Sequence, residues 1–262
     1  MDHREAGREA GRCWERNAPA WTKLAREGWD VYRDAVNTPG FLELLPDVAG
    51  KTGLDVGCGE GHNTRLFAGL GARMFGVDIA PTFVRLASEV RDGGVLYAAA
   101  SALELPFAEA QFDFATALMS LMDLPDHEAA LREIHRVIGD GGFMQFSIVH
   151  PCFWMPRRKL LRDAEGEAYA VELGGYFDRV DGRVERWLFS AAPEEATAGI
   201  EPFQVPVFHR TLAEWLNAVV DAGFRIERVA EPRADEETAR RLPVVQDTRV
   251  VGYFLHVRCR KS

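Results

Sequence analysis

Three glycines and one carboxylate are spaced in a way that could bind an adenosine cofactor. Gly57, Gly59 and Gly61 follow the short apolar run 54–56. Glycines at such a turn let a ligand approach the backbone, and the N–H groups that open the next helix would point at it. Asp78 ends the following apolar run, where a carboxylate can accept hydrogen bonds from both hydroxyls of a ribose. The alternatives are a tight corner without a ligand and, for Asp78, a helix N-cap.

The spacing of the glycines separates two kinds of adenosine cofactor. The dinucleotide fingerprint G-x-G-x-x-G needs a third glycine at position 62, which is His62 in this chain. The chain has G-x-G-x-G instead, and Asp55 lies two residues before its first glycine. A carboxylate there would repel a pyrophosphate but stabilise a cation. We therefore expect a cofactor that carries an ammonium and a sulfonium group.

Several stretches of the chain resemble the class I (Rossmann-like) S-adenosylmethionine-dependent methyltransferases. Residues 54–61 resemble the first motif of that family and residues 76–79 the second. Further similar stretches lie at 102–107, 112–113, 133–138 and 141–142. Together they cover about residues 45–150. Outside that region, the segments 150–153, 208–211, 222–224 and 231–232 resemble a bacterial small-molecule branch of these enzymes.

The resemblance implies S-adenosyl-L-methionine as cofactor, S-adenosyl-L-homocysteine as product, and a set of cofactor-binding residues. Asp55 and the backbone of the three glycines would hold the methionine end, Asp78 the ribose, and Ile79 would pack on adenine. Many relatives carry an acid at the position of Ser101, whose hydroxyl accepts more weakly, while the backbone of Ala102 could still serve. Leu118 would line the sulfonium pocket or belong to the core.

The N-terminal segment is rich in aromatic residues and could cover the cofactor. Aromatic faces exclude water and attract a sulfonium cation, so we expect a lid that includes Tyr32, or else ordinary packing of a helix face. The other aromatic residues of this lid are Trp14, Trp21 and Trp29. Arg26 could pair with the carboxylate of the cofactor, or be a solvated surface arginine.

Two histidines are candidates for a general base. Methyl transfer from a sulfonium requires alignment and desolvation more than a protein nucleophile, so a base is optional. His150 follows a predicted strand at the sheet edge where open α/β sheets bind ligands, and His209 could approach the same crevice. The alternative for each is a structural histidine whose ring nitrogens are satisfied.

Alternating strands and helices must position these residues. Short apolar runs predict strands at 54–56, 73–77, 95–99, 112–119 and 143–149, with helices between them. Strands at 224–230 and 250–258 follow a helix at 211–222, and a polar linker joins these two strands. We predict an α/β fold with a seven-stranded, mostly parallel Rossmann-like sheet, an antiparallel last strand, N-terminal helices and a small inserted substrate subdomain.

The predicted organisation has four parts along the chain. Residues 1–46 form an N-terminal helical lid, 47–150 the cofactor-binding core, 151–208 a substrate insertion or cap, and 209–262 the rest of the core sheet. In the insertion, two runs that flank 180–182 predict a hairpin. Its aromatic residues suit an apolar or aromatic acceptor, although a small hairpin also needs them to pack.

Composition excludes several classes of protein. The 262 residues are 47% hydrophobic and 27% charged with a net charge of −9, which gives no basic footprint for nucleic acid. Without an apolar run of about 18 to 20 residues we expect no membrane span. Four dispersed cysteines and no signal peptide predict a cytoplasmic protein. We expect a monomer or a homodimer. No cluster has metal-ligand spacing.

The predicted function is methyl transfer from S-adenosylmethionine to a small-molecule acceptor, most simply at oxygen or nitrogen. Two alternatives remain open from the residues. A nicotinamide-dependent oxidoreductase is disfavoured by His62 and Asp55. A protein that binds the cofactor without transferring a methyl group would explain why no residue is decisively catalytic. The acceptor itself is not indicated by any motif.

Overall fold

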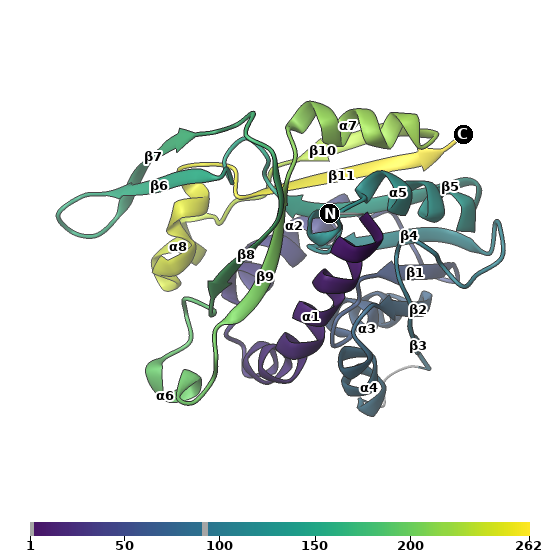
Figure 1. The fold of residues 1–262 in the computed structure, drawn as a ribbon, viewed down its shortest axis with the longest axis horizontal. Coiled ribbons are helices and arrows are strands. Elements are labelled where there is room, and N and C mark those ends of the chain that lie inside the picture. The colour runs from purple at the N-terminus through teal and green to yellow at the C-terminus, as the bar shows by residue number, and fades with distance from the viewer. Residues whose placement is uncertain (1–2, 91–93) are drawn as a thin grey trace.

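A seven-stranded sheet organises the computed structural model, which describes residues 3–90 and 94–262 (Figure 1). The strand order is β10-β11-β5-β4-β1-β2-β3. All neighbouring strands from β5 to β3 are parallel, and β11 runs antiparallel to both β5 and β10. The strands are β1 Thr52–Val56, β2 Arg73–Asp78, β3 Leu96–Ala99, β4 Phe112–Leu118, β5 Ile138–Val149, β10 Phe224–Ala230 and β11 Phe254–Lys261. The predicted fold class is confirmed.

Helices cover both faces of the sheet because its central strands are apolar on both sides. Along β4, Phe114 belongs to one buried cluster with Phe41 and Phe67, whereas Ala115 belongs to another with Leu131. The helices behind the first cluster are α2 Thr38–Leu44 and α3 His62–Gly69, and those behind the second are α5 His127–Val137 and α7 Leu212–Asp221. The remaining crossover helix is α4 Pro81–Glu89.

Local signals define where several helices begin. Pro81 occupies the first turn of α4, where its missing N–H is not needed. Asp126 caps α5 by accepting from the amide of Ala129, and Thr211 and Glu214 form a capping box at α7. These residues satisfy or remove amide donors of the first helical turn that have no partner within the helix.

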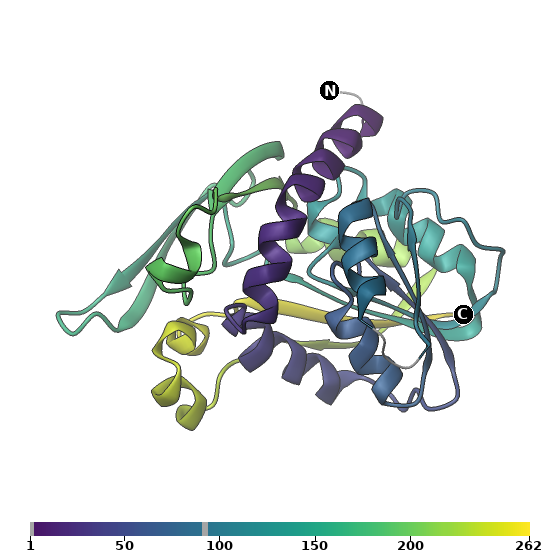
Figure 2. The ribbon, with the colours of Figure 1, turned by 90° about the horizontal axis from the view of Figure 1, so that it is seen from below.

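The N-terminal segment forms the expected helices and lies beside the sheet. α1 His3–Arg26 packs against α4 and β9, and the π-helical turn η1 Arg33–Asn37 leads into α2. Figure 2 shows α1 in purple, running past the sheet on the side that faces the inserted strands. The helix therefore contacts both the core, through α4, and the insertion, through β9.

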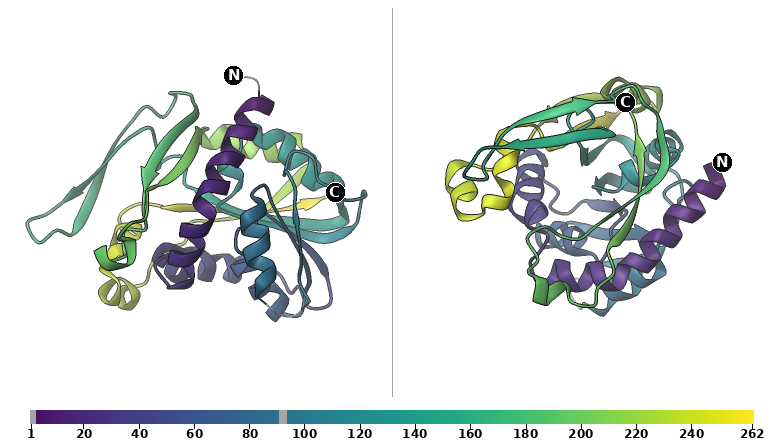
Figure 3. Two further views of the ribbon diagram at one scale, coloured as in Figure 1. Left: turned by 60° about the horizontal axis from the view of Figure 1, so that its bottom comes forward. Right: turned by 60° about the vertical axis from the view of Figure 1, so that its left-hand side comes forward.

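The insertion contains two antiparallel pairs of strands rather than one hairpin at 180–182. β6 Arg157–Arg162 pairs with β7 Ala168–Gly174, and β8 Val180–Trp187 pairs with β9 Phe203–His209 across the short helix α6 Glu194–Thr197. Gly182 lies inside β8 at a register shift, where its φ of +80° suits a bulge and not a hairpin turn. The prediction of a hairpin turn at 180–182 is therefore wrong, because these residues lie inside a strand. Figure 3 shows both pairs at one side of the molecule.

The segment before the last strand is helical, where a polar linker was expected. α8 Glu236–Arg241 and the 3₁₀ turn η3 Pro243–Arg249 lie there, and β11 begins four residues later than the predicted strand. Asp235 caps α8 through the amide of Thr238, and Ala239 and Val245 pack with Phe254 in a buried cluster. Within residues 3–90 and 94–262, no helix is both long and apolar enough for a bilayer crossing.

Candidate functional site

A cavity of about 810 Å³ lies where the carboxyl ends of the parallel strands meet the cap. We call the turns 57–61, 78–80 and 118–123 the floor of this cavity, and α1 with β8 and β9 its cap. Open α/β sheets bind ligands at this edge. Most of the predicted cofactor residues line the cavity, namely Gly57, Gly59, Asp78, Ile79, Ser101, Ala102, Leu118 and Tyr32.

The glycine turn is shaped by close approach at one glycine and by open space at the next. Gly57 has a φ of +73°, and a Cβ there would lie 2.3 Å from the Cβ of Ser120. Gly59 has a φ of +54° and nothing within 4 Å of the place of a Cβ. The absence of a Cβ at Gly57 thus lets the turn pack against Ser120, directly after β4. The absence of one at Gly59 leaves its backbone accessible to a ligand in the cavity.

Asp78 is held by two backbone donors at the end of β2. Its Oδ2 accepts from the amide of Gly59 at 2.9 Å and its Oδ1 from the amide of Ala80 at 2.9 Å. Burial raises the pKa of this carboxyl to about 6. Each carboxylate oxygen has a second lone pair, so the group can still accept from two hydroxyls of a ligand.

Charged side chains of both signs line the cavity. The acids are Asp30, Glu60, Asp78, Asp123 and Glu185, and the arginines are Arg33, Arg183, Arg186 and Arg210. Several of these charges are paired within the protein, since Asp30 pairs with Arg33, Glu185 with Arg183, and Glu60 with Arg26 and Arg65. The carboxyl of Asp78 lies beside the glycine turn, where a carboxylate favours a neighbouring ammonium or sulfonium group over a phosphate.

Asp55 lies beneath the turn and is not among the residues that line the cavity. It is buried, with Oδ2 accepting from the hydroxyl of Thr64 at 2.6 Å and Oδ1 from that of Thr116 at 3.0 Å. Burial raises its pKa to about 6. The structure therefore gives Asp55 a supporting place under the floor, whereas direct contact with the methionine end was expected.

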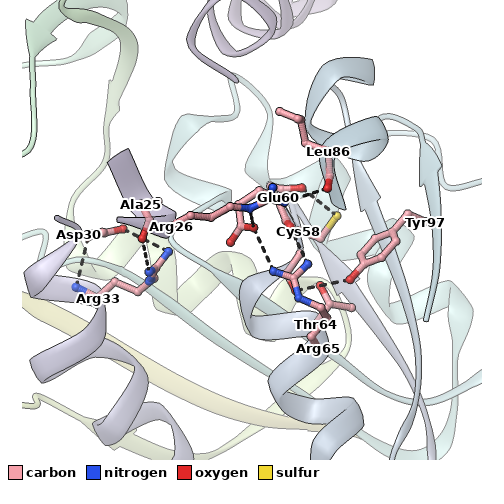
Figure 4. A network of polar contacts seen from close by, with 12 residues as sticks. Ala25, Arg26, Asp30, Arg33, Cys58, Glu60, Thr64, Arg65, Leu86 and Tyr97 are labelled. Carbon is pink, nitrogen blue, oxygen red and sulfur yellow. Dashed lines mark hydrogen bonds and ion pairs between the residues drawn. The ribbon is translucent and has the colours of Figure 1, made fainter. Parts of the chain in front are cut away.

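An ion-pair network joins α1 to the glycine turn (Figure 4). The guanidinium of Arg26 contacts Glu60 Oε2 at 3.0 Å and donates to the carbonyl of Leu86 at 2.8 Å. Arg65 contacts the same carboxylate oxygen at 3.0 Å. Arg26 is not among the residues that line the cavity, and its guanidinium is engaged with Glu60 and Leu86, whereas pairing with the cofactor was expected. Gly61 also lies off the lining, against the ring of Tyr97.

The adenine-side candidates lie together under the first turns of α1. Ile79 is exposed on the floor, and a Cβ at Gly11 of α1 would come within 2.9 Å of its Cγ1. Ser101 Oγ accepts from the amide of Leu103 at 3.2 Å, so its hydroxyl proton is free to be donated elsewhere. Ile79, Ser101 and Ala102 are therefore brought to one end of the cavity, beside the helix.

The cap is an aromatic cluster. Trp21 of α1 lies 5.3 Å from Trp14, 5.5 Å from Trp187 and 4.8 Å from Phe189, measured between ring centroids, with edge-on geometry. Such pairs contribute about 0.5 to 1.5 kcal/mol each beyond their buried area. Tyr32 lines the cavity but donates its hydroxyl to the carbonyl of Val244 at 2.6 Å, and burial raises its pKa.

The two candidate histidines have different surroundings. His150 is buried off the cavity lining, with Nε2 2.7 Å from Glu231 Oε1 and Nδ1 accepting from the amide of Cys152. Both ring nitrogens are therefore used in structural bonds, and the expected base position of His150 is not supported. His209 lines the cavity, and its Nε2 lies 2.8 Å from the carbonyl of Tyr176, so Nε2 is the donor and Nδ1 is an acceptor.

One functional group of the cavity was missed at the sequence level. Asp123 lines the cavity from the 3₁₀ turn η2 Leu121–Asp123, directly after β4. Its position after a predicted strand end was the available signal, since ligands bind outside the carboxyl ends of strands. In the described part of the chain, no group of three or more His, Cys, Asp or Glu side chains could hold a metal ion.

Comparisons with known proteins identify the region that forms the floor. Residues 54–146 match the protein family described as "Methyltransferase domain". This segment runs from β1 into β5 and includes every turn of the floor. A Haemophilus influenzae protein without an assigned function is 28% identical over 210 residues, which are 76% of this chain and 77% of that protein.

Named methyltransferases are also similar to the chain. The O-methyltransferase resE of Aspergillus sclerotiorum is 38% identical over 103 residues, which are 37% of this chain and 39% of that enzyme. The chain thus spans about two fifths of that enzyme. A crystal structure of an S-adenosylmethionine-dependent methyltransferase from Mesorhizobium loti has 26% identity and a TM-score of 0.69, covering 85% of this chain and 96% of that one.

Proposed function

We infer the function from the premise that this chain belongs to the class I S-adenosylmethionine-dependent methyltransferases. Its cofactor is S-adenosylmethionine. We propose that the chain transfers the methyl group to an oxygen or nitrogen atom of a small, largely apolar molecule. When bound, the cofactor supplies an electrophilic methyl group and leaves as S-adenosylhomocysteine.

One observation carries this proposal. A single cavity is lined on one side by the glycine turn and Asp78 and on the other by the aromatic residues of the cap, including Trp21 and Phe189. Cofactor and acceptor would therefore share one volume, which the aromatic residues of the cap shield from solvent on one side. Alignment in such a volume can supply several kcal/mol of the barrier to displacement.

Residues of the floor would bind the cofactor, and residues of the cap would shield it from solvent. Asp78 would accept from the ribose hydroxyls, and the backbone at Gly59 would contact the methionine end. Asp55 would act indirectly, by holding Thr64 and Thr116 beneath the turn. We propose that α1 acts as a lid over the cofactor. Residues 151–208, which include β8 and β9 of the cap, would bind the acceptor, because they line the cavity opposite the floor.

The acceptor class follows from the lining of the cap. Aromatic and aliphatic side chains favour a ligand with apolar or aromatic surface. The similarity to a fungal O-methyltransferase supports oxygen as one acceptor atom. Of the two predicted bases, only His209 lies at the cavity, where its Nδ1 could accept a hydrogen bond from such a group.

Calorimetric titration tests the cofactor half of this proposal. The chain should bind S-adenosylmethionine and S-adenosylhomocysteine with micromolar affinity and should not bind NADH. Asp78→Ala should weaken binding by about 100-fold, since each hydrogen bond to a charged group contributes about 1.5 to 3 kcal/mol. The exposed Asp140→Asn variant is the matched control. Binding of NADH alone would contradict the proposal.

Transfer itself is tested with methyl-labelled S-adenosylmethionine and a panel of phenols and amines. We expect label in at least one aromatic acceptor and an equal amount of S-adenosylhomocysteine. Cofactor binding without transfer to any acceptor would instead favour a protein that binds the cofactor and catalyses no methyl transfer.

A further inference from the structure

The carboxyl of Asp123 differs from the other carboxyls around the cavity because, in the described part of the chain, no protein donor satisfies it. Its side chain is only 9% exposed and lines the cavity. Asp78 accepts from two amides, Asp55 from two hydroxyls, and Glu60 contacts two arginines. Among the described residues, no hydrogen bond or ion pair reaches the Asp123 side chain. A buried, unpaired carboxyl is costly, so a ligand group is expected to complete it.

The backbone holds Asp123 in this position with little freedom. Met119, at the end of β4, has a φ of +54°, which is uncommon for a residue with a side chain. Ser120 Oγ donates to the carbonyl of Val56 at 2.7 Å, and the Asp123 amide donates to the carbonyl of Ser120 at 3.1 Å. Leu121 is fully buried between them. The turn is thus fastened to the end of β1, directly before the glycine turn, and strain of this kind is concentrated at functional sites.

The charged groups that face Asp123 leave its carboxyl available. From β2, Asp78 adds like charge, and together with burial, the larger effect, it raises the pKa of Asp123 well above the ordinary value. From the end of β9, Arg210 is occupied by Asp181 and by the carbonyls of His209 and Pro125. From α5, His127 is buried, and its pKa is lowered to about 4, so it is neutral. His209 also reaches the cavity from β9.

We propose that Asp123 is the residue that binds the acceptor through its O–H or N–H group and takes the proton during transfer. This inference rests on the proposed function. The acceptor atom uses its lone pair to form the bond to the methyl carbon, and the carbon–sulfur pair stays on sulfur. The acceptor's hydrogen leaves as a proton to Asp123 Oδ. The substrate class is therefore a neutral hydroxyl, or an amine whose ammonium proton passes to Asp123 before the freed lone pair attacks, on an apolar body, and not a nucleophile without a proton.

Two probe acceptors separate proton removal from positioning. Phenol must lose its proton during transfer, whereas a nitrophenol is already ionised at a mildly alkaline assay pH. Asp123→Asn keeps the shape of the side chain and removes the base, and Asp123→Glu keeps the base but displaces it. The exposed Glu128→Gln variant, on the neighbouring helix α5, is the matched control for a lost carboxylate.

We expect Asp123→Asn to lower kcat by a factor that depends on the acceptor. Asp123→Asn should bind S-adenosylmethionine within about threefold of wild type by calorimetry. Its kcat on phenol should fall by about 100-fold or more, the usual range for a general base, while its kcat on the nitrophenol falls less than tenfold. In wild type the kcat on phenol should rise with pH through the raised pKa of Asp123, and the variant should lack that step.

Each other outcome overturns the inference. An equal loss on both phenols would make Asp123 a positioning residue. A tenfold or larger loss of cofactor affinity in Asp123→Asn would assign the carboxyl to the cofactor. If wild type binds S-adenosylmethionine but methylates neither phenol nor benzylamine, the assigned substrate class fails while the cofactor assignment stands. If wild type does not bind the cofactor, the proposed function itself fails, and the same titration shows it.

Discussion

The floor and the cap of the cavity are built in different ways. On the floor, backbone turns follow strand ends, and their ligand-facing groups are held by short hydrogen bonds such as that from Gly59 to Asp78 at 2.9 Å. In the cap, aromatic side chains from α1, β8 and β9 meet edge to edge, and Trp187 remains 38% exposed. The floor is therefore defined by backbone geometry, and the cap by side-chain packing between segments distant in sequence.

This difference teaches which changes each side can tolerate. Hydrogen-bonded turns depend on the position of individual atoms, so a single added carbon can disrupt them. Aromatic clusters tolerate exchange of apolar groups of similar volume, usually at less than about 1.5 kcal/mol. We therefore expect substitutions in the floor to affect folding and cofactor affinity, and substitutions in the cap to affect the acceptor.

The largest effect is expected for Gly57→Ala. A left-handed φ costs about 1 to 2 kcal/mol for a residue with a Cβ, and the clash with Ser120 adds about 1 to 3 kcal/mol. The free energy of unfolding by urea should thus fall by about 3 kcal/mol. Ser120→Gly alone also loses the hydrogen bond from Ser120 Oγ to Val56, so it is the reference for the double variant Gly57→Ala, Ser120→Gly. In that background, Gly57→Ala should cost only the contribution of the left-handed φ. Gly59→Ala, with open space around it, should lose about 1 to 2 kcal/mol. Equal losses in the two single variants would contradict this account of the turn.

An effect of similar size, but dependent on pH, is expected for Asp55→Asn. Burial raises the pKa of Asp55 to about 6 from 3.8, so the folded chain binds this proton more tightly than the unfolded chain. Its contribution to stability is therefore present below pH 4 and is lost as the pH rises from about 4 to 6, by about 3 kcal/mol. The variant should lack this loss.

Urea unfolding at pH 4, 5, 6 and 7 measures that difference between wild type and Asp55→Asn. The exposed Asp140→Asn variant should show the same pH dependence as wild type. Parallel curves for wild type and Asp55→Asn would mean that the two threonine hydroxyls compensate fully for burial.

In the cap, Trp187→Ala should have a smaller effect, and it should change the KM for the acceptor rather than the free energy of unfolding. The ring of Trp187 lies 5.5 Å from that of Trp21 and lines the cavity. Its removal should raise the KM for an aromatic acceptor about tenfold, which corresponds to about 1.4 kcal/mol, and leave the Kd of S-adenosylmethionine within twofold. Tyr169→Ala, an exposed aromatic residue of β7 away from the cavity, should change neither. A matching loss of cofactor affinity would remove the distinction between floor and cap.

The smallest effect is expected where the two sides are joined, for Arg26→Ala. Arg26 is partly exposed, and Arg65 still pairs with Glu60 when Arg26 is removed. The melting temperature should fall by an amount that corresponds to at most about 1 kcal/mol. Arg12→Ala, an exposed arginine of the same helix that pairs with Glu9, should have no measurable effect. A loss above about 2 kcal/mol would show that α1 depends on this ion pair for docking.

Much of the floor could be predicted from the sequence because its signals are local. A glycine turn after an apolar run and an acid after the next one are read within a few residues, and both Gly57 and Asp78 line the cavity. The alternation of strands and helices likewise predicted the sheet, because strands buried on both faces are continuous apolar runs. The turns of the insertion and the helix α8 were not predicted. The cap of α8 at Asp235 is local, but the helix is stabilised by packing of Ala239 against Phe254, which belongs to a later strand.

The fold class, the glycine turn and the carboxylate that follows it could be inferred from the sequence, because turns and alternating apolar runs are patterns within a few residues. The folded arrangement was needed to show which titratable groups remain free. His150 is satisfied by Glu231, which is 81 residues away in the chain, whereas no described residue bonds to the second ring nitrogen of His209 at the cavity. The strands β9 and β5 and the helix α5 pack against the turn of Asp123, and within residues 3–90 and 94–262 nothing donates to its side chain. Whether a polar atom has a partner is a property of contacts between distant segments.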